Sequence, residues 1–387
     1  MIDKNTEILR ACEHLKMLLN EQYDRVERLL RKEQCNFNLS DKKIIIGLID
    51  GDGIGPVIMR EARKVLKELL KDEIDDGKVV LKDIEGLTIE NRLALKSSVP
   101  DYVLDEIKSC SVLLKGPTTT PNGGSMESAN VTLRRELDLF ANVRPVKVAE
   151  KGIDWIFFRE NTEGEYVLGS RGVQLFDDER LFALDFKVTT DIGTRRIARA
   201  AFDYAKNNNK RYVYLVTKAN IMKKTDGLFS KIVRETAKDY EGIELEEQYV
   251  DICAANLLNE GVREKFQVFI LPNLYGDIIT DEAAEIQGGV GTAGSANIGS
   301  RYAMFEAVHG SAPKMVEEGL AEFANPSSIL SAAVMMLNHI GFNEKADLLQ
   351  KTLDKARKDS GLKERLDRYE IKASTFTDEL IKNFKNI

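Results

Sequence analysis

A polar loop that runs into a short predicted helix carries the residues best suited to bind an anion. Ser128 and Asn130 stand where the apolar pattern places the first turn of that helix. Unpaired backbone N–H groups of a first turn and small polar side chains can meet one ligand there. Arg134 and Arg144 follow, and each offers a planar fork that matches a carboxylate. An ordinary helix cap with solvated arginines is the alternative, and these residues alone leave both interpretations open.

Acidic residues further along the chain have the spacing of a cation site. Asp277 and Asp281 are four residues apart, so on a helix both carboxylates lie on one face, one turn apart. Asp251 is a third possible oxygen donor, and such a set suits Mg²⁺ or Mn²⁺. The competing interpretation is a helix cap with first-turn acids that the helix dipole favours. A buried strand predicted to end at Leu271 favours a site, because open α/β sheets bind ligands at such ends.

A glycine-rich stretch at residues 288–299 precedes a third polar group. Glycine lets the backbone approach a ligand closely. His309 and Lys314 follow this stretch, and a cation beside an imidazole suits the phosphate of an adenosine cofactor. A loop without any ligand explains the same composition, so both interpretations stay open.

The elements that must position these residues have the pattern of an α/β domain. Residues 44–49 form a β-branched apolar run, typical of a strand buried on both faces, and a helical stretch follows up to Leu70. Between them, residues 51–56 have the spacing GxGxG and then proline, which is not the dinucleotide fingerprint GxGxxG. We therefore interpret them as a strand-to-helix turn and expect no Rossmann site. Further strands are predicted near 79–81, 111–115, 155–159, 212–217 and 268–272.

The first forty residues form a separate helical extension. Its mainly apolar positions alternate by four and three, which is the seam of a coiled coil. These positions are Ile8, Cys12, Leu15, Leu19, Gln22, Val26 and Leu29. The helix could pair with a second copy or lie on the body of the same chain, and the pattern favours neither. We expect a linker at residues 35–38 and the start of the body near Asp41.

Composition limits the possible partners. The 387 residues are 43% hydrophobic and 31% charged, which is typical of a soluble chain with room for two cores. A net charge of −7 argues against a nucleic-acid partner. The sequence contains no apolar run of membrane-spanning length and no signal peptide, so we expect a cytoplasmic protein. Four dispersed cysteines and three dispersed histidines predict neither a disulfide framework nor a histidine-based metal site.

Seven ordered motifs resemble the β-decarboxylating dehydrogenases, the family of isocitrate, isopropylmalate and homoisocitrate dehydrogenases. The resemblance runs from about Lys43 to the C-terminus. The motifs are GDGIGP at 51–56, KGP with TTP within 115–121, LRRELDLFANVRP at 133–145, FRENTEGEY at 158–166, TKANIMKKTDGLF at 217–229, NLYGDIITDEAAEIQGG at 273–289 and HGSAPK at 309–314. The fold implied is the two-domain α/β fold of that family, distinct from a Rossmann fold.

The resemblance implies metal-dependent oxidative decarboxylation of isocitrate to 2-oxoglutarate, a reaction of the tricarboxylic acid cycle. The Ser128-x-Asn130 pair is similar to that of isocitrate dehydrogenases, whereas isopropylmalate enzymes have apolar side chains there. By resemblance, Tyr166 and Lys218 are the catalytic residues, for enolate protonation and for the base side of the reaction. The implied substrate residues are Lys115, Ser128, Asn130, Arg134, Arg144 and Arg159, and the implied ligands of Mg²⁺ or Mn²⁺ are Asp251, Asp277 and Asp281.

The implied cofactor is NADP or NAD. Relatives that prefer NADP carry Lys-Tyr after HGSAP, and those that prefer NAD carry Asp-Ile. This chain has Lys314-Met315, and the lysine favours the 2′-phosphate of NADP. The implied cofactor residues are Thr120, His309, Gly310, Lys314 and Asn325. Ser128 also corresponds to a serine that some bacterial relatives phosphorylate, and a dianion there would repel a carboxylate substrate.

We expect a large domain from residues 41–140 and 288–387, a small central domain at 141–287, and an active site in the cleft between them. In relatives, Lys218 and Asp251 reach into the neighbouring subunit, so the resemblance implies a homodimer with shared sites. The extension at 1–40 is expected to change the assembly, for example from dimer to tetramer, and to take no part in the reaction. The alternatives are oxidation of homoisocitrate or 3-isopropylmalate, and a non-catalytic regulatory subunit, which the complete set of site residues argues against.

Overall fold

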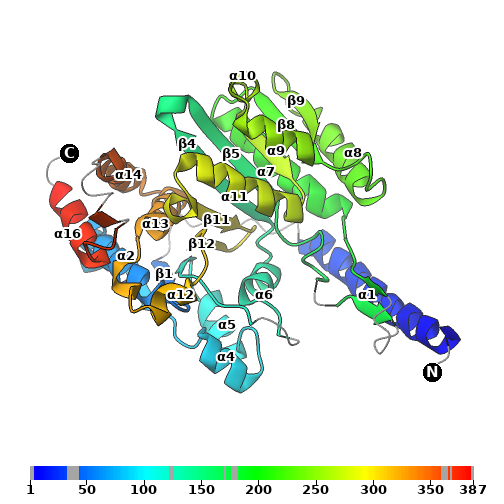
Figure 1. The fold of residues 1–387 in the computed structure, drawn as a ribbon, viewed down its shortest axis with the longest axis horizontal. Helices are drawn as coiled ribbons and strands as arrows, with labels where there is room; N and C mark the ends of the chain where they lie inside the picture. Colours follow the sequence, from blue (N-terminus) through cyan, green and yellow to red (C-terminus); the bar gives the residue numbers. More distant parts are fainter. Residues whose placement is uncertain are drawn as a thin grey trace. The chain divides into compact units, whose positions relative to one another are not determined.

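The computed structural model describes residues 4–32, 43–121, 126–169, 171–175, 182–358, 365–366 and 368–384. The chain forms two compact units. We call residues 1–36 and 158–278 the central unit, and residues 37–157 and 279–387 the flanking unit. Both units combine helices with strands (Figure 1), which confirms the predicted α/β class and the N-terminal helix. The expected linker at 35–38 and body start at Asp41 lie outside the described residues, and the expected domain boundaries stay predictions.

The flanking unit contains a mixed sheet with the strand order β2-β1-β3-β12-β11-β4. Neighbours from β2 to β12 are parallel, whereas β11 is antiparallel to both β12 and β4. The strands are β1 (Ile44–Ile49), β2 (Val79–Asp83), β3 (Val112–Lys115), β4 (Ala141–Val148), β11 (Gly294–Ile298) and β12 (Ala303–Ala307).

Helices cover both faces of this sheet, because its side chains alternate between two apolar clusters. Leu114 and Phe305 face the cluster formed with α2, α13, α14 and α16, whereas their neighbours Leu113 and Met304 face the cluster formed with α5 and α6. Figure 1 shows these two helix groups apart from each other. The helices are α2 (Gly55–Leu69), α3 (Lys71–Asp75), α4 (Ile89–Leu95), α5 (Asp101–Lys108), α6 (Ala129–Glu136), α12 (Pro313–Glu317), α13 (Ser327–His339), α14 (Asn343–Lys358) and α16 (Ala373–Asn383).

The central unit contains the parallel strands β10, β8 and β9, in that order. Helix α7 buries Ile197, Ala201 and Ala205, which are four residues apart and so lie on one face. The elements are α1 (Lys4–Lys32), β6 (Val173–Leu175), β7 (Phe182–Leu184), α7 (Asp191–Asn207), β8 (Tyr212–Thr217), α8 (Thr225–Ala237), β9 (Glu244–Tyr249), α9 (Val250–Leu258), α10 (Glu260–Arg263) and β10 (Val268–Leu271). Strands β6 and β7 form a separate antiparallel pair.

Two elements contribute residues to both units. The boundary falls after Phe157 within β5 (Ile153–Glu160) and after Ile278 within α11 (Asn273–Gln287). Both elements carry residues that the sequence singled out, so each unit contains its own part of the candidate site.

Helix α1 packs into the central unit along one face. Leu18 and Leu29 are buried there, and His14 Nε2 lies 2.9 Å from the carbonyl oxygen of Arg171. The helix therefore lies on its own chain, which was one of the two alternatives. Pairing with a second copy stays a prediction, and the seam residues that are exposed are Ile8, Cys12, Leu15 and Leu19. Across the described part of the chain, no helix has the length and hydropathy needed to cross a membrane.

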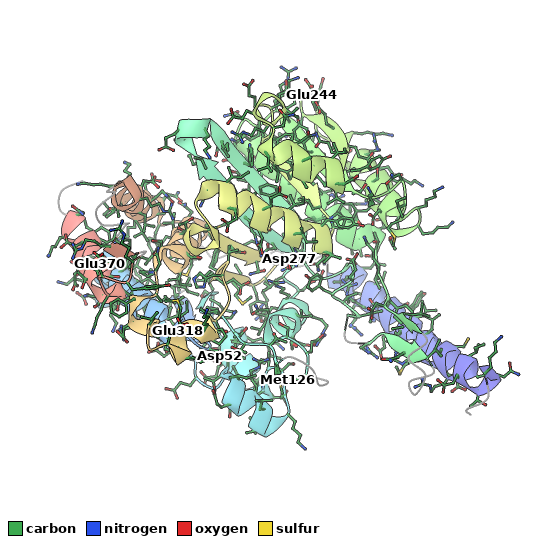
Figure 2. The ribbon with its side chains drawn as sticks, in the orientation of Figure 1. Asp52, Met126, Glu244, Asp277, Glu318 and Glu370 are labelled. Atoms are coloured by element: carbon green, nitrogen blue, oxygen red, sulfur yellow. The ribbon has the colours of Figure 1, made fainter. Side chains whose placement is uncertain are left out.

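Asp52 joins the turn between β1 and α2 to two other segments of the flanking unit; Figure 2 labels it. Its carboxylate accepts hydrogen bonds of 2.7 Å from the backbone N–H groups of Ile89 and Thr119. Gly51, which precedes it, has a φ of +71°, and a Cβ there would lie 2.1 Å from the carbonyl oxygen of Pro117. Residues 51–56 thus form the predicted strand-to-helix turn, and close backbone contact requires its first glycine.

We expect Gly51→Ala to destabilise the protein through both backbone strain and this steric clash. A left-handed φ costs a residue with a Cβ about 1–2 kcal/mol, and overpacking adds about 1–3 kcal/mol. Gly77→Ala is the matched control, because Gly77 has a φ of +72° and open space where the Cβ would be. Urea unfolding of both variants would measure the difference, and equal losses of stability would contradict the proposed clash.

Candidate active site

A buried carboxylate organises the predicted substrate residues of the flanking unit. Lys115 ends β3 and pairs in register with Glu306 on β12. The Lys115 Nζ lies 3.1 Å from Glu306 Oε2, and Arg134 Nη2 on α6 lies 3.3 Å from Glu306 Oε1. Asn297 donates a 2.8 Å hydrogen bond to the same carboxylate. Burial would raise the pKa of Glu306, but Lys115 and Arg134 outweigh it and lower the pKa to about 2.

Arg134 keeps hydrogen-bonding capacity for a further acceptor. Its Nε is buried and has no hydrogen-bond partner within the described residues, and an unsatisfied buried donor is costly. Ser128 stands directly before α6, and its side chain makes no capping bond. Asn130 lies in the first turn and accepts a 3.1 Å bond from Thr118 Oγ1. The structure therefore places these residues at or directly before one helix, and residues 122–125 lie outside the described part.

The central unit holds a second arginine–carboxylate group. Arg159 lies at the buried end of β5, and its Nε and Nη2 donate to Asn273 Oδ1 at 3.0 and 2.7 Å. Its Nη1 forms an ion pair with Asp277 on α11, which Figure 2 labels. The Tyr166 hydroxyl donates a 2.8 Å hydrogen bond to the other oxygen of Asp277. Thus the structure brings together three residues that the sequence predicted, and Asn273 orients the arginine among them.

Asp281 has its own arginine, in the flanking unit. Arg144 lies on β4, is buried, and donates from Nη1 to Asp281 Oδ1 and to Thr280 Oγ1, both at 2.7 Å. The Asp281 side chain is 56% exposed. Each of the two predicted metal ligands on α11 is therefore held by a different buried guanidinium.

Lys218 and Asp251 form a further pair in the central unit. The Lys218 Nζ lies 2.6 Å from Asp251 Oδ1. This hydrogen bond is the main cause of a lowered pKa at Asp251, so the carboxylate is ionised. The backbone N–H of Lys218 donates 2.8 Å to Asp226, which is fully buried and also pairs with Lys187 at 2.6 Å. The lysine is thus fixed at its backbone, while its ammonium group lies near the surface.

The acidic residues fit part of a site for a divalent cation. Asp277 and Asp281 lie one turn apart on α11, as predicted, and carboxylate oxygens suit Mg²⁺ or Mn²⁺. No group of three or more His, Cys, Asp or Glu that could hold a metal ion occurs in the described part of the chain. Among the described residues, Asp277 and Asp281 offer two of the three predicted donors on one helix.

Thr120 follows β3, and the other predicted cofactor residues follow β12. Ser311 Oγ lies 2.8 Å from Thr119 Oγ1, and the Ser311 carbonyl accepts from Ile54 N at 3.0 Å. Neighbouring Thr120 is exposed. His309 Nδ1 lies 2.9 Å from the carbonyl of Gly310. Two remaining residues are Lys314, whose side chain is 83% exposed, and Asn325, whose Oδ1 accepts from the backbone N–H of Ser327.

Glu306 and Asn273 are among the residues of these clusters that sequence reasoning missed. A signal existed for Glu306, because a lone carboxylate stands within the buried strand at 303–307 and buried charges are paired. Asn273 directly follows the buried strand β10 and Pro272, a position where α/β sheets build sites. Neither signal identifies the residue with which the side chain pairs.

Helices on both faces of a mostly parallel sheet, with polar clusters at strand ends and helix starts, define an α/β protein of the kind that binds small ligands. Residues 45–382 match the family model described as isocitrate/isopropylmalate dehydrogenase, so the chain belongs to this family.

Relatives of known name cover most of the chain. The NADP isocitrate dehydrogenase of Rickettsia prowazekii (strain Madrid E) is 40% identical over 316 residues, which are 80% of this chain and 62% of that protein. A Drosophila melanogaster protein named as a mitochondrial NAD isocitrate dehydrogenase subunit alpha is 37% identical over 82% of this chain and 80% of its own length. The crystal structure of isocitrate dehydrogenase from Methylococcus capsulatus has a TM-score of 0.78 and 35% identity over 88% of this chain and 99% of that one.

We expect Glu306→Gln to lower stability by about 3–5 kcal/mol at neutral pH, because Lys115 and Arg134 would lose their buried counter-charge. Glu322→Gln is the control, since Glu322 pairs with Arg60 at the surface and should cost about 1 kcal/mol or less. Urea unfolding of each variant would measure both.

The pKa of Glu306 predicts how this loss depends on pH. A folded-state pKa of about 2, below the ordinary glutamate value of about 4.5, stabilises the protein above pH 4.5, and this stabilisation is lost as the pH falls towards 2. The wild-type advantage over Glu306→Gln should therefore narrow by ~3 kcal/mol between pH 5 and 2. An advantage that stays constant over this range would show that the carboxylate is not held ionised.

Proposed function

We propose that this chain catalyses the metal-dependent oxidative decarboxylation of isocitrate to 2-oxoglutarate and CO₂, with reduction of NADP. The observation that carries the choice of substrate is the start of α6. Ser128 directly precedes this helix, and Asn130 and Arg134 lie on it; the Nε of Arg134 has no partner among the described residues, and this group suits an additional carboxylate. Membership of the isocitrate/isopropylmalate dehydrogenase family supports the reaction class. The chain spans 62% of the length of its Rickettsia prowazekii relative. The activity is therefore proposed from the residues of this chain and is not taken from the relative's name.

The arginines bind and orient the substrate in this proposal. Each guanidinium offers several N–H donors in one plane, so it can hold an aspartate and a substrate carboxylate together. Arg144 and Arg159 also pair with Asp281 and Asp277, and carboxylates that hold a metal must be deprotonated. Asp277 and Asp281, with Asp251 of a second copy, would hold Mg²⁺ or Mn²⁺. When bound, such an ion lowers the pKa of the substrate hydroxyl and stabilises charge on the adjoining oxygens.

Two side chains move protons. Lys218 Nζ, beside Asp251, serves the base side and takes the hydroxyl proton while hydride passes to the nicotinamide. Decarboxylation of the resulting β-keto acid leaves an enolate. The Tyr166 hydroxyl, held by Asp277, returns a proton to its carbon.

Lys314 carries the choice of cofactor. Its ammonium group is exposed and lies 3.8 Å from Glu318 Oε1, so the phosphate of a bound cofactor could contact it. A cation there stabilises the dianionic 2′-phosphate that distinguishes NADP from NAD.

We further propose that the active unit is a homodimer with shared sites. Each copy offers Asp277 and Asp281 on one helix, and no described group within a copy adds a third acidic donor. Asp251 and Lys218 of a second copy would complete the set.

The preference of the protein for substrate and for cofactor can be measured in one set of assays. With Mg²⁺ or Mn²⁺, purified protein should reduce NADP fastest with isocitrate, and more slowly with homoisocitrate or 3-isopropylmalate, as followed by nicotinamide absorbance. Lys314→Asp should shift preference towards NAD by about tenfold or more, because it replaces attraction with repulsion. Faster turnover of another substrate would overturn the isocitrate assignment alone, and no turnover in any pairing would favour a regulatory subunit.

The second prediction concerns shared sites. Tyr166→Phe and Lys218→Met should each be nearly inactive, but when the two chains are coexpressed, mixed dimers should regain one complete site. Random pairing of subunits predicts about a quarter of wild-type activity. If Lys218 served the site of its own chain, every site in the mixed dimer would carry one defect, and no activity would return.

A further inference from the structure

Helix α1 lies outside the segment that matches the family model, yet one of its side chains reaches a motif of the candidate site. Arg25 is largely buried, with 12% of its side chain exposed. Its Nη1 lies 3.1 Å from Glu163 Oε1, and its Nη2 lies 3.4 Å from Thr162 Oγ1. Both partners belong to the FRENTEGEY segment at 158–166, which also carries Arg159 and Tyr166.

Arg25 compensates two buried carboxylates that lie three residues apart. Glu160 and Glu163 are each 2% exposed. Glu160 accepts bonds from the backbone N–H groups of Thr162 and Glu163, at 2.9 and 2.7 Å. Burial, together with repulsion from Glu163, raises the pKa of Glu160 to about 7, and Arg25 acts against this rise. Two buried carboxylates without a cation would be strongly unfavourable.

Glu163 holds its segment to the start of α7. Its carboxylate accepts from the backbone N–H of Thr190 at 2.8 Å and from the Thr190 hydroxyl. Gly193 makes room for it, because a Cβ there would lie 2.4 Å from Glu163 Oε1. A helix N-terminus favours an anion, and Arg25 supplies the counter-charge from the other side.

The same segment is joined to the proposed proton donor. The Glu163 carbonyl accepts a 2.9 Å bond from Asn273 Nδ2, and Asn273 Oδ1 accepts from Arg159. Arg159 and Tyr166 in turn both bind Asp277. All of these residues belong to the central unit, so the contacts form one connected network from α1 to Tyr166.

We propose that Arg25 is a positioning residue for the proposed reaction: by neutralising the Glu160–Glu163 pair, it fixes the segment that places Arg159 and Tyr166. This inference rests on the proposed function. It also departs from the expectation that the N-terminal extension stays outside the chemistry.

The test compares Arg25→Met with Arg25→Lys and Arg10→Met in the full-length protein. Arg10 lies on the same helix and bonds the carbonyl of Gln174, so its loss controls for a general effect on α1. Arg25→Met should lower kcat/KM for isocitrate by about tenfold and raise KM for isocitrate, with KM for NADP unchanged. Arg25→Lys should recover part of the loss, because it keeps the charge, and Arg10→Met should behave as wild type. An unchanged kcat/KM in Arg25→Met, or equal losses in Arg25→Met and Arg10→Met, would overturn the proposal.

Two further measurements keep this inference separate from the proposed reaction. Hydrogen exchange of the ligand-free protein, read by mass spectrometry, should be faster at residues 160–166 in Arg25→Met and unchanged in Arg10→Met. Combining Arg25→Met with Glu163→Gln should restore slow exchange, because the charge imbalance is removed. Hydrogen exchange tests the role of Arg25 even if the wild-type protein oxidises neither isocitrate, homoisocitrate nor 3-isopropylmalate. That failure would overturn the proposed function alone. If residues 160–166 of Arg25→Met exchange at the same rate as in the wild-type protein, the proposed role of Arg25 is overturned.

Discussion

The constraint on which the rest of this structure depends is that a carboxylate withdrawn from water must meet a cation or several hydrogen-bond donors. Glu306 meets Lys115 and Arg134, and Glu163 meets Arg25 and the start of α7. Such pairs gain little net stability over an apolar core, but removing one partner is costly. They therefore fix the position of each arginine and lysine, and a site for a multiply charged acid needs cations in fixed positions.

Three arginines of the candidate site are prepared for ligands in different ways. Arg134 is bonded to Glu306 and retains a buried donor without a partner in the described chain, and Arg144 and Arg159 are bonded to Asp281 and Asp277. In the free protein these carboxylates stand in for the anionic groups that the arginines are proposed to bind. These ion pairs hold the arginine side chains in place, so little side-chain entropy is left to lose on binding.

Local patterns carried most of what the sequence predicted. The run at 44–49, the turn at 51–56 and the heptads of α1 are determined by neighbours in the chain, so their types could be predicted. The motifs also placed Ser128, Asn130 and Arg134 on one helix and the aspartates of α11 one turn apart. Partners distant in the chain could not be predicted. Arg25 is 138 residues from Glu163, and Arg134 is 172 from Glu306, and no spacing rule connects positions so far apart. The contact of α1 with the FRENTEGEY segment was missed for this reason.

The hydrogen bonds of the Asp52 carboxylate have a consequence for the kinetics of the proposed cofactor binding. One carboxylate holds the backbone of Ile89 and Thr119, and the turn that carries it is bonded through Ile54 to the carbonyl of Ser311. These segments of the flanking unit are ordered when the protein folds, so their conformational entropy is already lost before the proposed dinucleotide would bind. The proposed binding should then need no rearrangement of these segments, and its rate should depend on encounter and charge.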